Sequence, residues 1–371
     1  MLYGDLTQRT GGTIYDAEVV RGLERAGDDV HVVSLDADAP AVPRGFAATL
    51  PPIARAAHTA KAGFELARQI AAIAPEIMVG DELCFRELAI AFRMVGRGKR
   101  VPRRVLLVHH LTAWETELAP LRRRAVRVGE RLAIDACDGI VATSRTTRER
   151  LVAEGVRERI DVVVPGADRL ERGRGRERER GREVRFVFVG AVVARKRVVE
   201  MVRAFGGGAS KVGRLVIVGS TTRDQAYVGE VRRAIAEHGL GERVEMTGEI
   251  DEEGVARALD DADVLVMPSS LEGYGIAATE AIWAGLPVIA ARAQGLEEAL
   301  APCPDARLFA DDEPELAAAL MRFATDASLR ASMTEAARVA ADGMPTWSQC
   351  VDDFRASLRD DASAPAARHL S

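Results

Sequence analysis

Short apolar runs alternate along this chain with stretches of helical periodicity. In the first half, continuous apolar runs that predict strands lie at 30–35, 104–110, 139–144 and 160–166. Positions with a helical repeat of apolar residues lie at 15–27, 56–73 and 125–137. Apolar strands between helices are typical of a parallel sheet that is covered on both faces. The pattern therefore predicts a doubly wound α/β unit over residues 1–168.

The same alternation restarts after a polar interruption. Strands are predicted at 184–193, 214–220, 244–248, 263–270 and 286–292. Helices are predicted at 196–205, 226–239, 252–261, 275–284 and 313–342. The fold class is thus α/β, with a second Rossmann-like unit at 184–345, a linker at 169–183 and a final helix with a frayed tail at 346–371.

The interruption, "ERGRGRERERGRE" at 171–183, has no apolar periodicity. Its six arginines are offset by four glutamates. We therefore interpret it as a solvated linker, in preference to an RNA-binding tract.

Composition narrows the class of protein. A chain of 371 residues exceeds what one core usually supports, and its net charge of −5 does not favour nucleic acid as a partner. Four cysteines without a CxxC pair argue against a zinc site or a disulfide framework. No apolar run approaches the ~20 residues of a membrane span, and no basic-then-apolar leader is visible. We expect a cytoplasmic protein, and we expect its native start upstream of Met1, because only "MLYG" precedes the first loop.

Two facing doubly wound units form a cleft, and ligands of such sheets bind beyond the carboxyl ends of the strands. Gly11 and Gly12 precede a strong helix, whose free amides and positive end suit an anion. A tight turn with Thr13 as N-cap is the alternative. His109 and His110 end a strand, where alternation allows one of them to face the cleft. Metal binding there is not expected, because no third His or Cys is placed to help.

Paired cations and paired carboxylates follow strands of the second unit. Arg195 and Lys196 open a helix, where cations oppose the helix dipole, so a diphosphate ligand is favoured. In "EGYGIAATE", Glu272 lies in the loop after a buried strand and Glu280 lies more than a turn into the next helix. A carboxylate can clamp vicinal hydroxyls, and the amides from Gly273 onward suit an oxyanion or a sugar hydroxyl. Two carboxylates that suit hydroxyl groups, with cations and amides that suit a diphosphate, predict a ligand in which a diphosphate joins two polyols. Such a ligand is a nucleotide sugar.

Two "DAD" sequences raise the possibility of a metal. In another class of sugar transferases, a DxD motif holds the divalent ion on the donor diphosphate. Asp36–Asp38 follows a strand and is the better candidate, whereas Asp261–Asp263 reads as a helix-to-strand turn. We predict that neither binds a metal.

These residues resemble family 4 glycosyltransferases, which have the two-domain GT-B fold, over nearly the whole chain. The most specific match is "PSSLEGYGIAATEAIWAGLPVIA" at 268–290, which is similar to the family's Glu-x7-Glu signature. The other matching segments are "GG" at 11–12, His109, "VATS" at 141–144, "VVPGAD" at 163–168, "FVG…RK" at 188–196, "VGS" at 218–220, "VEMTG" at 244–248 and the last helix at 347–354.

The resemblance implies a retaining transferase that moves a hexose from a nucleoside diphosphate sugar, UDP- or GDP-linked, to an acceptor, with no further cofactor. We also expect it to need no divalent metal, because Lys196, Arg195 and helix dipoles would take the place of the ion. The resemblance implies that Glu280 binds the ribose, that Glu272, Gly273, Tyr274 and Gly275 hold the hexose, and that Lys196 neutralises the leaving diphosphate. It also places His109 at the reaction centre, with Gly11 and Gly12 near the donor diphosphate and the acceptor. Two departures stand out: Ala191 replaces a common arginine, a loss that Arg195 would have to offset, and His110 has no assigned role.

Other functions remain open at this level. A sugar-nucleotide epimerase or hydrolase on the same fold would need a general base, and a non-catalytic nucleotide-sugar-binding subunit would not need Glu272, Lys196 and His109 together. The acceptor could be a glycan, a lipid or a small molecule. Basic segments at 97–104 and 122–127 could contact an anionic membrane peripherally or form a solvated basic face.

Overall fold

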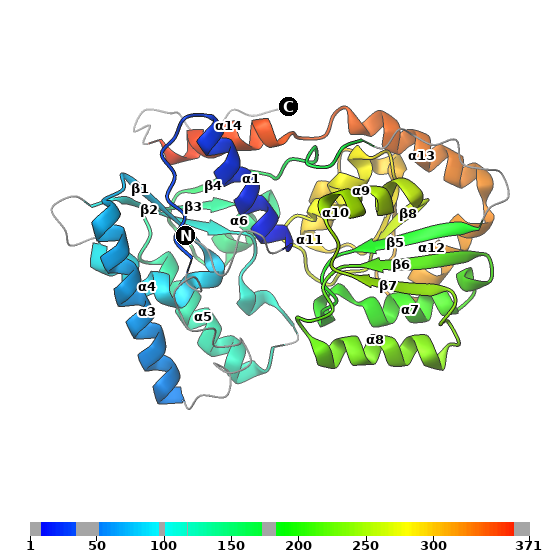
Figure 1. Cartoon of the computed structure of the whole chain (residues 1–371), viewed down its shortest axis with the longest axis horizontal. Coiled ribbons are helices and arrows are strands. Elements are labelled where there is room, and N and C mark those ends of the chain that lie inside the picture. Colours follow the sequence, from blue (N-terminus) through cyan, green and yellow to red (C-terminus); the bar gives the residue numbers. More distant parts are fainter. Residues whose placement is uncertain (1–8, 35–51, 96–100, 117, 173–182, 360–371) are drawn as a thin grey trace.

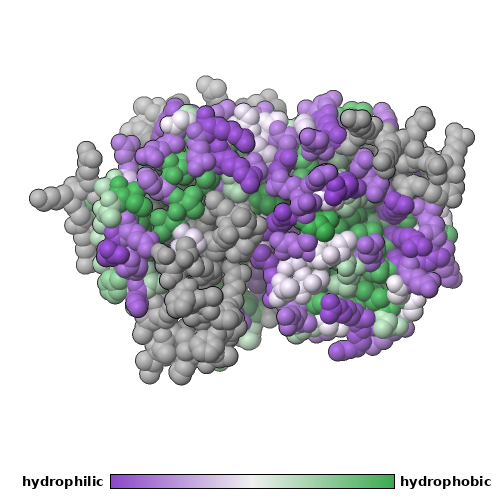
Figure 2. Space-filling model, in the orientation of Figure 1, coloured by the Kyte–Doolittle hydropathy of each residue, from purple (hydrophilic) through white to green (hydrophobic). Residues whose placement is uncertain are grey.

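A computed structural model describes residues 9–34, 52–95, 101–116, 118–172 and 183–359, with the side chains of 52–58 excluded. Two α/β domains lie side by side, and the chain passes back to the first domain at its end (Figure 1). The motif at Asp36–Asp38 and most of the expected linker lie outside the described residues. In the view of Figure 2, hydrophilic residues dominate the outer edge of the C-terminal domain.

The N-terminal domain is built on a parallel sheet of four described strands in the order β1-β2-β3-β4. These strands are β1 (Ile77–Asp81), β2 (Arg103–Val108), β3 (Gly139–Ala142) and β4 (Ile160–Val162). Alternate residues of β2 face opposite layers. Leu106 and Val108 belong to a core with α3 (Pro52–Ile73), α4 (Phe85–Val95) and α5 (Pro120–Ile134). A further helix, α6 (Arg145–Ala153), follows β3. Val105 and Leu107 pack under α1 (Gly11–Arg25) and α14 (Trp347–Leu358).

The prediction of a strand at 30–35 is wrong for the part that the structure describes. Residues 30–33 belong to neither sheet, and Ser34 forms an isolated bridge. A strand needs a partner for its backbone N–H and C=O groups, and apolar content alone does not supply one. Conversely, β1, α4 and α6 are present although the hydrophobic pattern did not single them out.

The C-terminal domain has a parallel sheet of six described strands in the order β10-β9-β8-β5-β6-β7. They are β5 (Val184–Val189), β6 (Gly213–Val218), β7 (Val244–Gly248), β8 (Val264–Met267), β9 (Val288–Ala290) and β10 (Arg307–Phe309). Helices on its two faces are α7 (Val198–Gly206), α8 (Gln225–Glu237), α9 (Glu252–Asp261), α10 (Ile276–Trp283), α11 (Gln294–Ala299), α12 (Glu313–Thr325) and α13 (Ala327–Ala341). The single helix expected at 313–342 is divided at Asp326, whose side chain caps α13 by accepting a hydrogen bond from Leu329 N at 2.9 Å.

The two domains are tied together by α14 and by α11. Trp347 and Phe354 on α14 lie edge-to-face with Tyr15 on α1, at ring-centroid distances of 5.9 and 6.4 Å. On α11, Glu298 accepts hydrogen bonds from the amides of Arg145 and Thr146 at 2.8 and 2.9 Å, and so caps α6 of the other domain. Among the described helices, none combines the length and the apolar character that a membrane crossing requires.

Candidate active site

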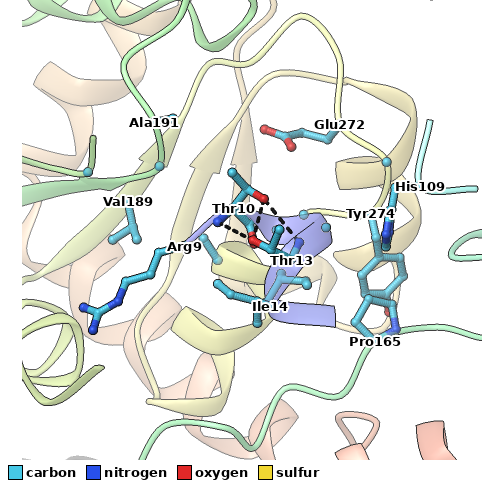
Figure 3. Close-up of a pocket in the computed structure, with 18 of the residues that line it drawn as sticks. Arg9, Thr10, Thr13, Ile14, His109, Pro165, Val189, Ala191, Glu272 and Tyr274 are labelled. Carbon is cyan, nitrogen blue, oxygen red and sulfur yellow. Dashed lines mark hydrogen bonds between the residues drawn. The ribbon is translucent and has the colours of Figure 1, made fainter. Parts of the chain in front are cut away.

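A cleft of about 620 Å³ opens between the domains, at the carboxyl ends of the strands of both sheets. Its lining includes the residues after β2 and β5, the loop before α10 and the N-terminal turn of α1 (Figure 3). All of the residues that the sequence predicted for the site line this one cleft: Gly11, Gly12, His109, Arg195, Lys196, Glu272, Gly273, Tyr274, Gly275 and Glu280.

The first turn of α1 faces the cleft. The helix begins at Gly11, earlier than the predicted Tyr15, and Thr10 is its N-cap where Thr13 had been considered. Thr10 N donates to Thr13 Oγ1 at 3.0 Å, and Thr13 N donates to Thr10 Oγ1 at 3.2 Å (Figure 3). This reciprocal capping box holds the helix start in place. A Cβ on Gly11 would meet no atom within 4 Å, so its backbone is open to a ligand.

His109 is held rigidly at the end of β2. Its backbone N donates to Glu82 Oε2 at 3.0 Å, and its carbonyl oxygen accepts from Thr147 Oγ1 at 3.1 Å. Its ring nitrogen Nε2 lies 3.4 Å from Asp16 Oδ1. Burial by itself lowers the pKa of His109, but Glu82, Asp16 and Asp81 outweigh burial and raise this pKa to about 10. These carboxyl groups therefore favour the protonated form of His109 at neutral pH.

His110 also lines the cleft, contrary to the expectation that one histidine alone would do so. The reason is that β2 ends at Val108, so strand alternation does not govern these two residues. The ring of His110 lies 3.5 Å from Glu115, through Nε2 and Oε1.

Lys196 and Glu272 form a buried ion pair on the C-terminal side of the cleft. Lys196 Nζ donates a hydrogen bond to Glu272 Oε1, and the Arg195 guanidinium lies 3.7 Å from Glu272 Oε2. Burial raises the pKa of Glu272, but Lys196 and Arg195 outweigh it, so the net pKa lies below its ordinary value. Arg195 and Lys196 were expected to open the following helix. Both lie instead in the short 3-10 helix Ala194–Lys196, which precedes α7.

Arg169 is a site residue that the sequence did not reveal. It lies in the cleft and forms ion pairs with Glu280 at 2.7 Å and with Glu252 at 3.1 Å. Burial raises the pKa of Glu280, and although Arg169 opposes this shift, the net pKa remains above its ordinary value. Arg169 directly follows the "VVPGAD" match, but the Arg-rich run beyond it concealed its role and led to its assignment to the linker.

Gly273 brings the two domains into direct contact. A Cβ at this position would lie 2.5 Å from the carbonyl oxygen of His109. A side chain would therefore push the Glu272 loop away from β2. The packing explains why glycine follows Glu272 here.

Cations beyond the predicted pair also reach the cleft. Arg9 and Arg223 line it, and Arg9 donates a hydrogen bond to the carbonyl oxygen of Ile250. Ala191 lies in the lining as well, so the arginine that it replaces would have faced this space. The sequence suggested Arg195 as the cation that offsets the loss of this arginine. Arg9 and Arg223 are two further cations of the cleft that could offset it.

Two observations bear on a metal. Asp263 accepts a hydrogen bond from Arg185 N at 2.8 Å, and Asp261 lies 3.9 Å from the Arg185 guanidinium, so the second "DAD" braces a turn outside the cleft lining. Within the described residues, potential ligand atoms of Asp16, Asp81 and His109 lie within 4.8 Å of one another. The sequence-based search for a third His or Cys overlooked these carboxylates. The prediction of no metal remains a prediction.

The fold resembles that of solved GT-B glycosyltransferases. Sucrose-phosphate synthase from Thermosynechococcus elongatus superimposes with a TM-score of 0.80 at 20% identity, with 96% of each chain covered. HepE from Anabaena, in complex with UDP and glucose, gives a TM-score of 0.71 at 15% identity, covering 96% of this chain and 98% of that one. The fold of this chain is therefore the GT-B fold, as expected.

Two models of glycosyltransferase families match the sequence of this chain. The model "Glycosyltransferase Family 4" matches residues 10–169, and the model "Glycosyl transferases group 1" matches residues 171–340. The chain belongs to the family 4 glycosyltransferases.

Two curated relatives carry the same name. D-inositol 3-phosphate glycosyltransferase of Mycolicibacterium smegmatis is 28% identical over 273 residues, which are 70% of this chain and 60% of that protein. The protein of the same name from Jonesia denitrificans is 34% identical over 143 residues, which are 38% of this chain and 34% of that protein. The chain thus spans about a third to three-fifths of the length of these two relatives.

Proposed function

We propose that this enzyme transfers a hexose from a nucleoside diphosphate sugar to an acceptor with retention of the anomeric configuration. The observation that carries the proposal is the pair of buried carboxylates, Glu272 and Glu280, each held in the same cleft by a cation. Glu280 would bind the ribose hydroxyls, and Glu272 would bind the hexose. A UDP-linked donor is favoured over a GDP-linked one because HepE, which has the same fold, binds UDP and glucose.

The charges of the cleft suit departure of a diphosphate. In the reaction, the bond between the anomeric carbon and the diphosphate oxygen breaks, and the acceptor oxygen bonds to the same face of that carbon. The acceptor proton passes to the departing diphosphate. Lys196 and Arg195 stabilise the charge that develops on the leaving group, a contribution that fixed cations in a dry cleft make efficiently. We propose that they replace a divalent metal in this role.

The pairing of charges in the cleft argues against a sugar-nucleotide epimerase or hydrolase and against a non-catalytic binding subunit. An epimerase or hydrolase needs a group that accepts a proton, but Glu272 and Glu280 are engaged by cations, and His109 is already protonated at neutral pH. A non-catalytic binder would not need the buried Lys196–Glu272 pair beside His109, since burying two charges is costly. A transferase uses all of these groups.

A phosphorylated polyol is the acceptor class that we propose, because the curated relatives are named for inositol 3-phosphate. Arg9 and Arg21, which line the cleft on the α1 side, are suitable partners for such a phosphate. The test is a matrix of UDP- and GDP-hexoses against inositol phosphate and inositol, with and without EDTA. We expect nucleoside diphosphate release that depends on the acceptor and survives EDTA. Release without an acceptor, or activity restored only by Mn²⁺, would contradict the proposal.

We also propose that the N-terminal domain contacts an anionic membrane through one face of α5. Leu121, Val128 and Leu132 recur at helical spacing and are 85%, 56% and 45% exposed. The helix carries five arginines and one glutamate, and that glutamate, Glu130, is buried. Exposed apolar residues flanked by arginines are the pattern of a helix that lies in a membrane interface.

Vesicle binding tests this contact. Wild-type protein should co-sediment with vesicles that contain phosphatidylglycerol and much less with pure phosphatidylcholine, and salt should weaken the binding. The double variant Leu121→Ser/Val128→Ser should lose it. Val339→Ser, a substitution at a position 70% exposed on α13, is the matched control and should bind like wild type. Equal binding by all three proteins would exclude α5 as the contact.

A further inference from the structure

A buried acidic cluster lies behind His109, on the side of α1. Asp16, Asp81 and Glu82 are 4%, 2% and 2% exposed. They come from separate elements, since Asp16 is on α1, Asp81 ends β1, and Glu82 begins the turn that follows. Three carboxyl groups thus share a water-poor environment with one imidazole.

The three carboxyl groups are engaged differently. Glu82 accepts a hydrogen bond from the His109 amide, and Asp81 accepts one from Leu83 N at 2.7 Å. Both carboxylate oxygens of Asp16 are buried, and among the described residues neither has a hydrogen-bond partner within normal geometry. The nearest oppositely charged group to Asp16 is the ring of His109, with Nε2 3.4 Å from Oδ1.

The ring of His109 has little freedom to leave this position. Tyr15 packs edge-on against it, with ring centroids 5.3 Å apart and an interplanar angle of 80°. A Cβ on Gly12 would lie 3.2 Å from its Cδ2 atom. On the other side the ring borders the cleft, together with Glu272 and Tyr274 (Figure 3). Asp16 and the cleft therefore contact the same fixed imidazole.

We propose that Asp16 is a positioning residue that keeps His109 protonated and oriented, so that His109 acts on the donor as a fixed hydrogen-bond donor and not as a base. The proposal rests on the proposed function for the identity of the donor. An unpaired buried carboxylate is costly, and a proton on the neighbouring imidazole removes that cost. Asp16 Oδ1, 3.4 Å from the ring nitrogen Nε2, is the carboxylate oxygen placed to pair with the imidazolium.

This arrangement suits a reaction in which positive charge develops on the hexose. An isolated imidazolium beside that charge would oppose it. Paired with Asp16, His109 can donate a hydrogen bond to a hydroxyl group while the pair adds no net charge. It also prevents His109 from taking the acceptor proton, which leaves the diphosphate as the group that receives it.

The decisive measurement is the titration of His109 by NMR in the full chain with ¹⁵N-labelled histidine. Wild type should keep His109 protonated well above neutral pH. Asp16→Asn should bring deprotonation into the neutral range and add a loss of kcat on the alkaline side of the pH profile, and Asp16→Glu should restore part of both. Asp28→Asn, which removes an exposed ion pair with Arg355, is the control and should leave both unchanged. An unaltered titration of His109 in Asp16→Asn would overturn the proposal.

Two other outcomes are separated by the same samples. If metal analysis of purified wild-type protein finds one equivalent of a divalent ion, and its removal shifts the His109 signals, the cluster binds a metal and the proposal is wrong. If the titration behaves as expected but no nucleotide sugar is turned over, the proposed function fails while the Asp16–His109 pairing stands. Should Asp16→Asn unfold, Asp16→Glu supplies the comparison, because it keeps the charge and moves the carboxylate.

Discussion

The guanidinium of Arg169 lies 2.7 Å from the carboxylate of Glu280, and the two side chains are 7% and 3% exposed. Arg169 comes from the segment that leaves the first domain, whereas Glu280 lies within α10 of the second. The carboxylate that we assign to the ribose is therefore held in place by a residue from the crossing between the domains. Glu252 adds a second carboxylate to the same guanidinium.

Removal of Arg169 should be costly in both stability and binding. In Arg169→Ala, Glu280 would be left as an unpaired buried charge, and breaking such a pair typically costs about 3–5 kcal/mol. The affinity for nucleoside diphosphate should fall as well. Arg257→Ala, at an exposed pair with Glu253, should cost about 0.5 kcal/mol or less. Urea unfolding and calorimetric titration check both variants, and equal losses would argue against a special role of Arg169.

The two glutamates should differ in kind. Glu280→Gln removes a contact to a part of the donor that does not change during the reaction, so the donor and free nucleotide should weaken together. The loss should be about 1.5–3 kcal/mol, the range for hydrogen bonds to a charged group. Glu272→Gln should spare the affinity for free nucleotide and lower kcat, because the hexose develops positive charge. If nucleotide affinity falls in Glu272→Gln alone, the two assignments are reversed.

Lys196→Ala should lower kcat by on the order of 10²–10³, the usual effect of losing one group that stabilises developing charge. Its partner Glu272 would also lose its hydrogen bond, so the double variant Lys196→Ala/Glu272→Ala should be less impaired than the sum of the single changes. Lys211→Ala, which removes a lysine exposed outside the cleft, controls for charge. Strict additivity would show that the pair is not coupled.

His109→Ala should abolish most transfer, whereas His110→Ala should be milder. His109 is fixed by Glu82, Thr147 and Asp16, while His110 makes a single long contact with Glu115. Steady-state kinetics of the two variants decide between them. The opposite order would mean that His110 is the residue at the reaction centre.

Stability should depend on pH through His109. Its folded-state pKa of about 10 lies above the ordinary value of 6.5, so its contribution is fully present below about pH 6.5 and is lost as pH rises through 10. Wild type should lose thermal stability relative to His109→Gln between these limits. Paired thermal unfolding curves from pH 6 to 10 measure this, and a constant difference would contradict the shifted pKa.

The residues that line the cleft were easier to locate from the sequence than the elements of the first domain. Clear apolar runs predict the strands that precede Glu272, Lys196 and His109. The sequence therefore indicated that these residues lie at the carboxyl edges of the sheets. Arg169 was missed because its partner is 111 positions away, and no local spacing reports such a contact. Asp16 was missed for a similar reason: on the pattern of α1 it is one polar position among others, and its burial depends on β1 and β2. The residues at 30–33 failed as a strand because strand formation depends on a partner that the segment does not encode.

The return of α14 to α1 affects how this enzyme could be recombined with its relatives. Trp347, Cys350 and Phe354 belong to the same core as Tyr15 and Val105, although they follow the second domain in the chain. A chimera that exchanges donor specificity by cutting once, near residue 168, would give the first domain a foreign closing helix. The first domain is discontinuous in the chain, because α14 completes its core. An exchange of the continuous segment 169–345, cut at both ends, would transfer the second domain intact and leave 346–359 with the first domain, against which it packs.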